Sequence, residues 1–111
     1  MIKILSLIRD YEDWGEGEDD FVVQYELQIG LENSADYSNF SFDVISPKRL
    51  ERSICDKDIE IGYGLMIMTD FNTKLVEHTV ERLVRMSFGK DYDETVCQLS
   101  RYFRRRMDRD D

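Results

Sequence analysis

The alternation of apolar and polar side chains from Phe21 to Leu31 is the feature that most restricts the fold of this chain. The apolar phase holds Phe21, Val23, Tyr25, Leu27, Ile29 and Leu31, and the other phase holds Val22, Gln24, Glu26, Gln28 and Gly30. Successive side chains of a β-strand point to opposite faces of the sheet. The pattern therefore predicts a strand with one face buried in a core.

Three further segments have the pattern of strands. Residues 1–9 are apolar and β-prone, and residues 40–44 repeat the alternation after a loop over 32–36 that suits a hairpin. A fourth strand is predicted from Ile59 to Thr69, where two glycines, Gly62 and Gly64, indicate a bulge or a close approach of the backbone.

The period changes to that of a helix after Asp70. An apolar stripe lies opposite a charged face and consists of Leu75, Val76, Val80, Leu83, Val84 and Phe88. We expect Asn72 or Asp70 to cap this helix and Gly89 to end it.

Two other helix starts are visible. Ser46 followed by Pro47 predicts a short helix through about Ser53. Asp91 with Glu94 three residues later is a variant of the capping box. It predicts a last helix whose inward side chains are Val96, Leu99 and Phe103.

The predicted order is β-β-β-(short α)-β-α-α. Strands followed by helices favour an α+β fold, in which an antiparallel sheet of about four strands is covered on one face by the two C-terminal helices. The 111 residues form one domain, 1–111, because a second domain would be too small to hold its own core.

The composition restricts the partners. The net charge is −9, so we expect neither nucleic acid nor an anionic membrane as a partner, and a basic protein is compatible. Solubility alone is the alternative reason for the acidity. No apolar run approaches the ~20 residues of a membrane span. The start lacks the features of a signal peptide, and a cytoplasmic location is expected.

No group of residues has the pattern of a catalytic or metal site. With 24 acidic residues, carboxylate pairs arise by chance, and none stands in an apolar setting that would raise a pKa. His78 lies on the polar side of its helix, so a solvated histidine is favoured over a dyad with Cys97. One histidine and two cysteines supply too few ligands for zinc. We expect no enzyme activity, metal or cofactor.

The densest cluster of carboxylates lies between the first two predicted strands. Residues 10–20 hold seven of them, and the predicted partner-binding residues are Asp10, Glu12, Asp13, Trp14, Glu16, Glu18, Asp19 and Asp20. Tryptophan is enriched at interface hot spots. The alternatives are a solvated loop, with Trp14 folded back over the sheet edge, or a calcium loop. A calcium loop would place Trp14 and Phe21 where oxygen ligands are required.

Five arginines mark the C-terminal end: Arg101, Arg104, Arg105, Arg106 and Arg109. Cations suit a helix C-terminus, so a solvated helix end is favoured, and pairing with the chain's own acidic loop is the alternative. Residues 1–60 carry 15 acidic and 6 basic side chains, whereas residues 61–111 carry 9 of each. The negative charge therefore lies in the N-terminal half.

Two parts of the chain have a distinctive order and spacing of residues. The first is the run from Phe40 to Leu50 followed by Gly62-Tyr63-Gly64-Leu65-Met66-Ile67. The second contains Gly89-Lys90-Asp91-Tyr92 and then Leu99-Ser100-Arg101-Tyr102-Phe103. With these motifs the chain resembles the immunity protein 8 family over roughly residues 20–105. Where the family continues with an aromatic–acidic–aromatic run, this chain has Arg104-Arg105-Arg106-Met107.

The resemblance implies a cytosolic bacterial antidote of a polymorphic-toxin or contact-dependent growth inhibition system. Such a protein has no catalytic residues and binds the toxin domain encoded beside it. These toxins are often basic nucleases, and carboxylates would then stand in for substrate phosphates. The alternatives are a non-catalytic interaction module or homo-oligomeric assembly subunit, joined through a sheet edge and unrelated to toxins, and a small hydrolase that uses acidic residues.

Overall fold

A sheet of five strands forms the centre of the computed structural model, which describes residues 2–106. The three long strands β1 (Ile2–Trp14), β2 (Phe21–Leu31) and β3 (Tyr37–Ile45) are antiparallel neighbours. Two short strands, β4 (Leu65–Ile67) and β5 (Arg104–Arg106), share the free edge of β3, β4 parallel and β5 antiparallel to it. The predicted α+β class is confirmed, with a sheet that is mixed rather than antiparallel throughout.

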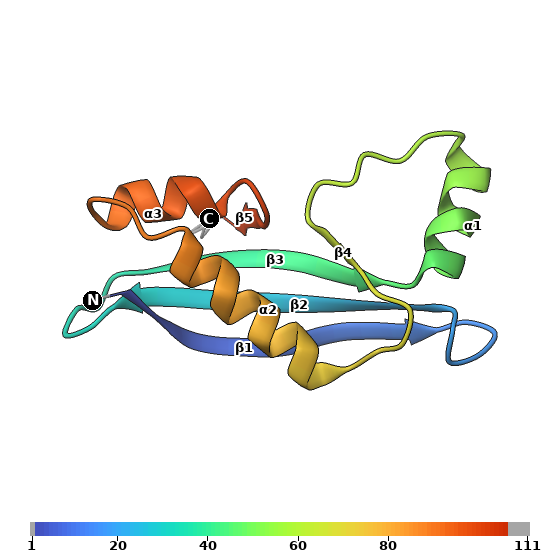
Figure 1. The fold of residues 1–111 in the computed structure, drawn as a ribbon, viewed down its shortest axis with the longest axis horizontal. Helices are drawn as coiled ribbons and strands as arrows, with labels where there is room; N and C mark the ends of the chain where they lie inside the picture. Colours follow the sequence, from blue (N-terminus) through green and yellow to red (C-terminus); the bar gives the residue numbers. More distant parts are fainter. Residues whose placement is uncertain (1, 107–111) are drawn as a thin grey trace, which may run out of the picture.

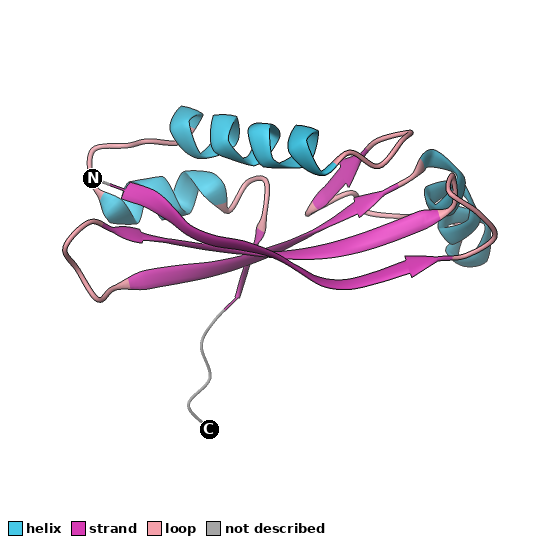
Figure 2. Ribbon diagram, turned by 90° about the horizontal axis from the view of Figure 1, so that it is seen from below, coloured by secondary structure: helices cyan, strands magenta, loops and turns pink. Residues whose placement is uncertain are grey.

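Three helices accompany the sheet. Helices α2 (Thr73–Met86) and α3 (Tyr92–Leu99) cover one face, whereas α1 (Pro47–Lys57) lies at the end where β3 finishes (Figure 1). Seen from the side, α2 and α3 lie above the sheet and α1 lies beside its end, while no helix of residues 2–106 lies on the opposite face (Figure 2). The molecule is therefore built in two layers, as predicted.

The core lies between the sheet and the two helices. The apolar phase of β2 is buried as predicted from Phe21 to Ile29, while Leu31 is half-buried. Facing it are three valines of α2, namely Val76, Val80 and Val84, and the predicted inward residues Val96, Leu99 and Phe103. The stripe of α2 is narrower than predicted, because Leu75 and Phe88 are exposed.

The three helix starts agree with their sequence signals. The Ser46 hydroxyl accepts a hydrogen bond from the amide of Arg49, and Asn72 accepts one from Leu75. Asp91 caps α3 as predicted, since its carboxylate accepts from the Glu94 amide. The return bond of a capping box differs, because the Glu94 carboxylate accepts from the amide of Lys90, one residue before the cap. Two helix ends were predicted wrongly: α1 continues to Lys57, and α2 ends at Met86 before reaching Gly89.

The strand predicted over residues 59–69 forms only between Leu65 and Ile67. After β3 the chain passes through α1 and returns parallel to β3, and a parallel neighbour can be reached only by such a crossover. Residues 59–64 belong to that connection. Ile59 and Ile61 are 72% and 78% exposed, although their alternation with polar residues predicted a buried face.

The C-terminal part also differs from the prediction of a solvated helix end. Helix α3 ends at Leu99, and the chain turns through residues 100–103 into β5. Arg104 pairs with Asp43 at 3.1 Å and Arg106 with Glu26 at 2.7 Å. These arginines thus bind strand carboxylates rather than the acidic segment 10–20; Arg109 lies outside the described residues. No helix within residues 2–106 is long and apolar enough to cross a membrane.

Candidate partner-binding site

The predicted partner-binding residues lie at one end of the sheet, next to α1 (Figure 1). The expectation that residues 10–20 form a loop was wrong for the first five of them. Asp10–Trp14 continue β1, and Trp14 is paired with Phe21 across the ribbon. Backbone pairing with β2 resumes after a register shift between Arg9 and Tyr11, so the ladder extends through the charged residues. Only residues 15–20 form the turn, which does not match a twelve-residue calcium loop beginning at Asp10.

Asp20 is the one predicted contact residue that is not at the surface. Its carboxylate has no exposed surface and accepts hydrogen bonds from Nε of Arg49 at 2.7 Å and from Nη1 of Arg52 at 2.8 Å. It also accepts one from the amide of Glu16 at 3.0 Å. Every oxygen of this buried group is thereby satisfied, and Asp20 holds the turn against α1 rather than facing a partner.

The electrostatics of Asp20 follow from these contacts. The hydrogen bond from Arg49 holds the pKa of the Asp20 carboxyl below its ordinary value, although burial acts in the opposite direction. Gly15 makes room for the cluster, because a Cβ at this position would lie 2.8 Å from Nη2 of Arg49 and still closer to the Asp20 carboxylate. The sequence contained the parts of this cluster, but spacing gave no sign that residues so far apart would meet.

Trp14 is half-buried at the edge of the helix-bearing face. Its ring lies 4.9 Å from that of Phe21 and 5.9 Å from that of Phe71. The indole Nε1 donates to the carboxylate of Glu12 at 2.8 Å. Trp14 therefore folds back over the sheet, as the alternative interpretation held, yet 37% of its surface is still exposed. A partner can reach the outer edge of a ring that is already fixed in place.

The surface carboxylates of this end differ in their pairing. Asp13 pairs with Arg49 at 3.1 Å, Asp19 with Lys48 at 3.6 Å and Glu12 with Arg9 at 3.5 Å. For the remaining three, namely Asp10, Glu16 and Glu18, the structure of residues 2–106 has no ion pair. All three are exposed. We name the surface formed by Asp10, Glu12, Asp13, Trp14, Glu16, Glu18 and Asp19 the acidic end.

Residues with catalytic or metal-binding chemistry are scattered. Across residues 2–106, no three histidine, cysteine, aspartate or glutamate side chains are grouped in a way that could hold a metal ion. His78 is exposed on α2, and Cys55 and Cys97 are both free and exposed. The arrangement at the acidic end can offer charge and one aromatic edge to a partner, which is the chemistry of recognition.

The fold and this surface define a small α+β domain whose distinctive surface chemistry suits protein recognition. The sequence profile of a family described as Immunity protein 8 matches residues 1–108. The chain belongs to the Immunity protein 8 family. Members of an immunity family act against toxins and are generally not enzymes. Comparison with curated proteins and with solved structures gave no match.

Proposed function

We propose that this protein binds a cognate bacterial toxin domain and neutralises it by covering its active site or substrate surface. The toxin would belong to a polymorphic-toxin or contact-dependent growth inhibition system, and the antidote would act in the cytoplasm. The observation that supports a binding surface is the acidic end, where the exposed edge of Trp14 stands together with three carboxylates that have no ion pair within residues 2–106.

The negative charge of the acidic end suits a partner with a basic surface. A toxin that cleaves nucleic acid needs a basic surface to hold phosphates. Carboxylates projecting from a fixed turn can occupy such a surface, and opposite charges accelerate the encounter of two proteins. The contacts of Asp20 with Arg49 and Arg52 fix the turn before binding, which lowers the conformational entropy lost on association.

The outer edge of β1 is where a homo-oligomeric assembly subunit would join a second copy. Strand β1 is the outer strand of the sheet, and a long unpaired edge can join another sheet. Here two register shifts, between Ile4 and Ser6 and between Arg9 and Tyr11, interrupt that edge. Bulges and charged residues are the features by which sheet edges avoid pairing. They favour the toxin-binding proposal over assembly through this edge.

Co-expression with the toxin tests the proposal. The toxin would be the variable C-terminal domain of a large secreted protein encoded next to this gene. We expect cells that express this domain to survive only when the protein is present, and we expect the two purified proteins to form a one-to-one complex. A non-cognate toxin domain of the same activity is the control. Loss of viability together with no complex by calorimetry would refute the proposed function.

A further inference from the structure

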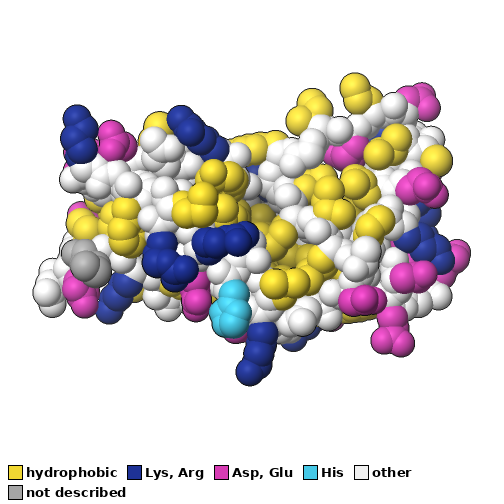
Figure 3. All heavy atoms as spheres, in the orientation of Figure 1, with side chains coloured by type: hydrophobic (Ala, Val, Ile, Leu, Met, Phe, Trp, Pro, Cys, Tyr) yellow, Lys and Arg dark blue, Asp and Glu magenta, His cyan; other side chains and the backbone are white. Residues whose placement is uncertain are grey.

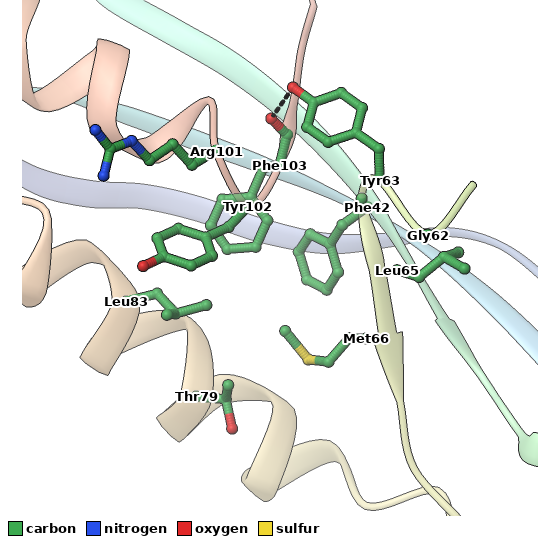
Figure 4. Close-up of a pocket in the computed structure, with 11 residues that line it drawn as sticks. Phe42, Gly62, Tyr63, Leu65, Met66, Thr79, Leu83, Arg101, Tyr102 and Phe103 are labelled. Atoms are coloured by element: carbon green, nitrogen blue, oxygen red, sulfur yellow. Dashed lines mark hydrogen bonds between the residues drawn. The ribbon is translucent and has the colours of Figure 1, made fainter.

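A groove on the helix-bearing face has no part in the acidic end. It runs between α2 and the segment 59–68, and two adjoining cavities of about 260 and 200 Å³ lie along it. Both cavities are lined by Met66 on one side and by Thr79 of α2 on the other. The larger cavity has Leu83 and Tyr102 on one side and Tyr63 across from them, with Phe42 and Phe103 at its floor (Figure 4).

Exposed apolar side chains line the walls of this groove, and grouped apolar side chains of this kind are typical of interaction sites. Ile67 and Leu75 line the smaller cavity from its two sides and are 55% and 52% exposed. Apolar side chains gather on this face between α2 and the 59–68 segment (Figure 3). The exposure of Leu75 is the more notable because the sequence placed it in the apolar stripe of its helix.

Positive charge borders the groove on the side of the helices. Arg101 lines the larger cavity, and Arg82 and Arg85 line a third hollow of about 270 Å³ over the outer ridge of α2. Within the described part of the chain, none of these three arginines has an ion pair. Arg49, Arg52, Arg104 and Arg106 of the same chain are all paired. In a protein of net charge −9, these three arginines, which have no ion pair among residues 2–106, give the side of the groove a local positive charge.

We infer that the groove between α2 and residues 59–68 receives an acidic segment of the toxin partner. Apolar side chains of that segment would enter the two cavities, and its carboxylates would bind Arg82, Arg85 and Arg101. Arginine forms bidentate pairs with carboxylates, and the apolar walls lower the local dielectric around such pairs. The inference rests on the proposed function and adds the chemistry of a second contact.

The position of Trp14 links the two surfaces. Its ring packs on Phe71, which lies four residues before Leu75 at the start of the groove. Trp14 and the groove therefore lie on the same, helix-bearing face. A partner seated over this face would place a basic surface on the acidic end and an acidic segment on the arginines. Two opposite charge pairings fix the orientation of a partner, which a single patch cannot do.

Calorimetry with the adjacent toxin domain tests this inference. The charge variant is Arg82→Gln/Arg101→Gln, and its control is Lys3→Gln/Lys90→Gln, which changes the net charge equally at exposed sites away from the groove. The apolar variant is Leu75→Ser, at a side chain that lines the smaller cavity and is 52% exposed. We expect each groove variant to weaken toxin binding about tenfold or more, and the control to bind like the parent.

The outcomes separate the inference from the proposed function. If the toxin domain binds the parent and both groove variants equally, the groove inference is wrong and the proposed function stands. If the parent itself binds no toxin domain, the proposed function fails and the inference fails with it. If sedimentation shows parent self-association that the groove variants lose, the occupant is a second copy of this chain, which also overturns the inference. Thermal melts of every variant confirm that each is folded.

Discussion

Arg49 donates from Nε to the buried carboxylate of Asp20 at 2.7 Å, and this contact joins the start of α1 to the turn between β1 and β2. The same guanidinium also donates from Nη2 to the backbone carbonyl of Asp20 at 3.3 Å. The amide of the next residue, Phe21, donates to the Ser46 hydroxyl that caps α1. The acidic end is thus held by a continuous set of hydrogen bonds that reaches into the core.

The lowered pKa of Asp20 gives the first prediction, an acid-sensitive part of the stability. A carboxyl whose pKa is lower in the folded than in the unfolded chain stabilises the fold above its unfolded pKa, about 3.9. This stabilisation is lost as the pH falls through the folded value. We expect Asp20→Asn to lower stability at pH 7 and to lose less stability than the parent between pH 5 and pH 2. Urea melts across this range measure the difference.

Glu18→Gln is the matched control for Asp20→Asn. Glu18 belongs to the same turn, is exposed, and has no ion pair in the part of the chain that the structure describes. Its stability curve should follow that of the parent. If the gap between Asp20→Asn and the parent stays constant from pH 7 to pH 2, the carboxylate contributes no pH-dependent stability and the prediction is wrong.

The second prediction contrasts two glycines of the segment before β4. Gly64 has a φ of 75°, a left-handed conformation that L side chains rarely adopt, and a Cβ there would lie 2.8 Å from Nη1 of Arg104. At Gly62 an added Cβ would have no atom of the described chain within 4 Å other than those of Gly62 and its two chain neighbours. We expect Gly64→Ala to cost about 1–2 kcal/mol of unfolding free energy. Gly62→Ala should be neutral or slightly stabilising, and equal melting temperatures would contradict this assignment.

The third prediction concerns the core beneath α3. Leu99 is fully buried between α3 and the sheet, whereas Leu75 of α2 is 52% exposed. Leu99→Ala should lower the free energy of unfolding by about 2–5 kcal/mol, because it removes buried methyl groups and leaves a cavity. Leu75→Ala should change it by about 0.5 kcal/mol or less. Chemical denaturation of both variants measures these values, and a small effect of Leu99→Ala would mean that α3 is not packed as described.

Local signals predicted most of the fold. The alternation from Phe21 to Ile29 predicted the buried face of β2. Ser46-Pro47, Asn72 and Asp91 predicted the helix starts, because a capping side chain binds backbone amides only two or three residues away. Each of these features is a short-range relationship that the order of residues contains directly.

The failures of prediction share a different cause. Ile59 and Ile61 alternate with polar residues like a buried strand, but the crossover from β3 through α1 leaves them exposed. The sequence predicted Asp20 to be a surface carboxylate, yet it is buried and pairs with Arg49 and Arg52 of α1. Pairing between residues far apart in the chain decided each case, and periodicity carries no information about such partners. The acidic end was located by its composition, while the buried role of Asp20 within it was missed.

The last prediction concerns the kinetics of toxin binding at the acidic end. Charges at an interface rim act mainly on the rate of association, whereas a buried aromatic acts mainly on dissociation. The charge variant is Asp10→Asn/Glu16→Gln/Glu18→Gln, which removes the three carboxylates of the acidic end for which residues 2–106 supply no ion pair. We expect it to associate roughly tenfold more slowly at low salt, and to depend less on salt than the parent.

Two comparisons make this prediction specific. The control variant removes the same number of negative charges at the far end of the molecule, by the substitutions Glu32→Gln/Asp36→Asn/Asp93→Asn. We expect its association rate to stay close to that of the parent. Trp14→Ala should instead speed release by roughly thirtyfold, equivalent to about 2 kcal/mol, if the exposed edge of the ring becomes buried in the complex. Surface plasmon resonance at several salt concentrations separates the two rates. Unchanged rates in both acidic-end variants would contradict the prediction. The toxin would then be expected to bind the helix-free face of the sheet, where Gln24, Glu26 and Gln28 lie.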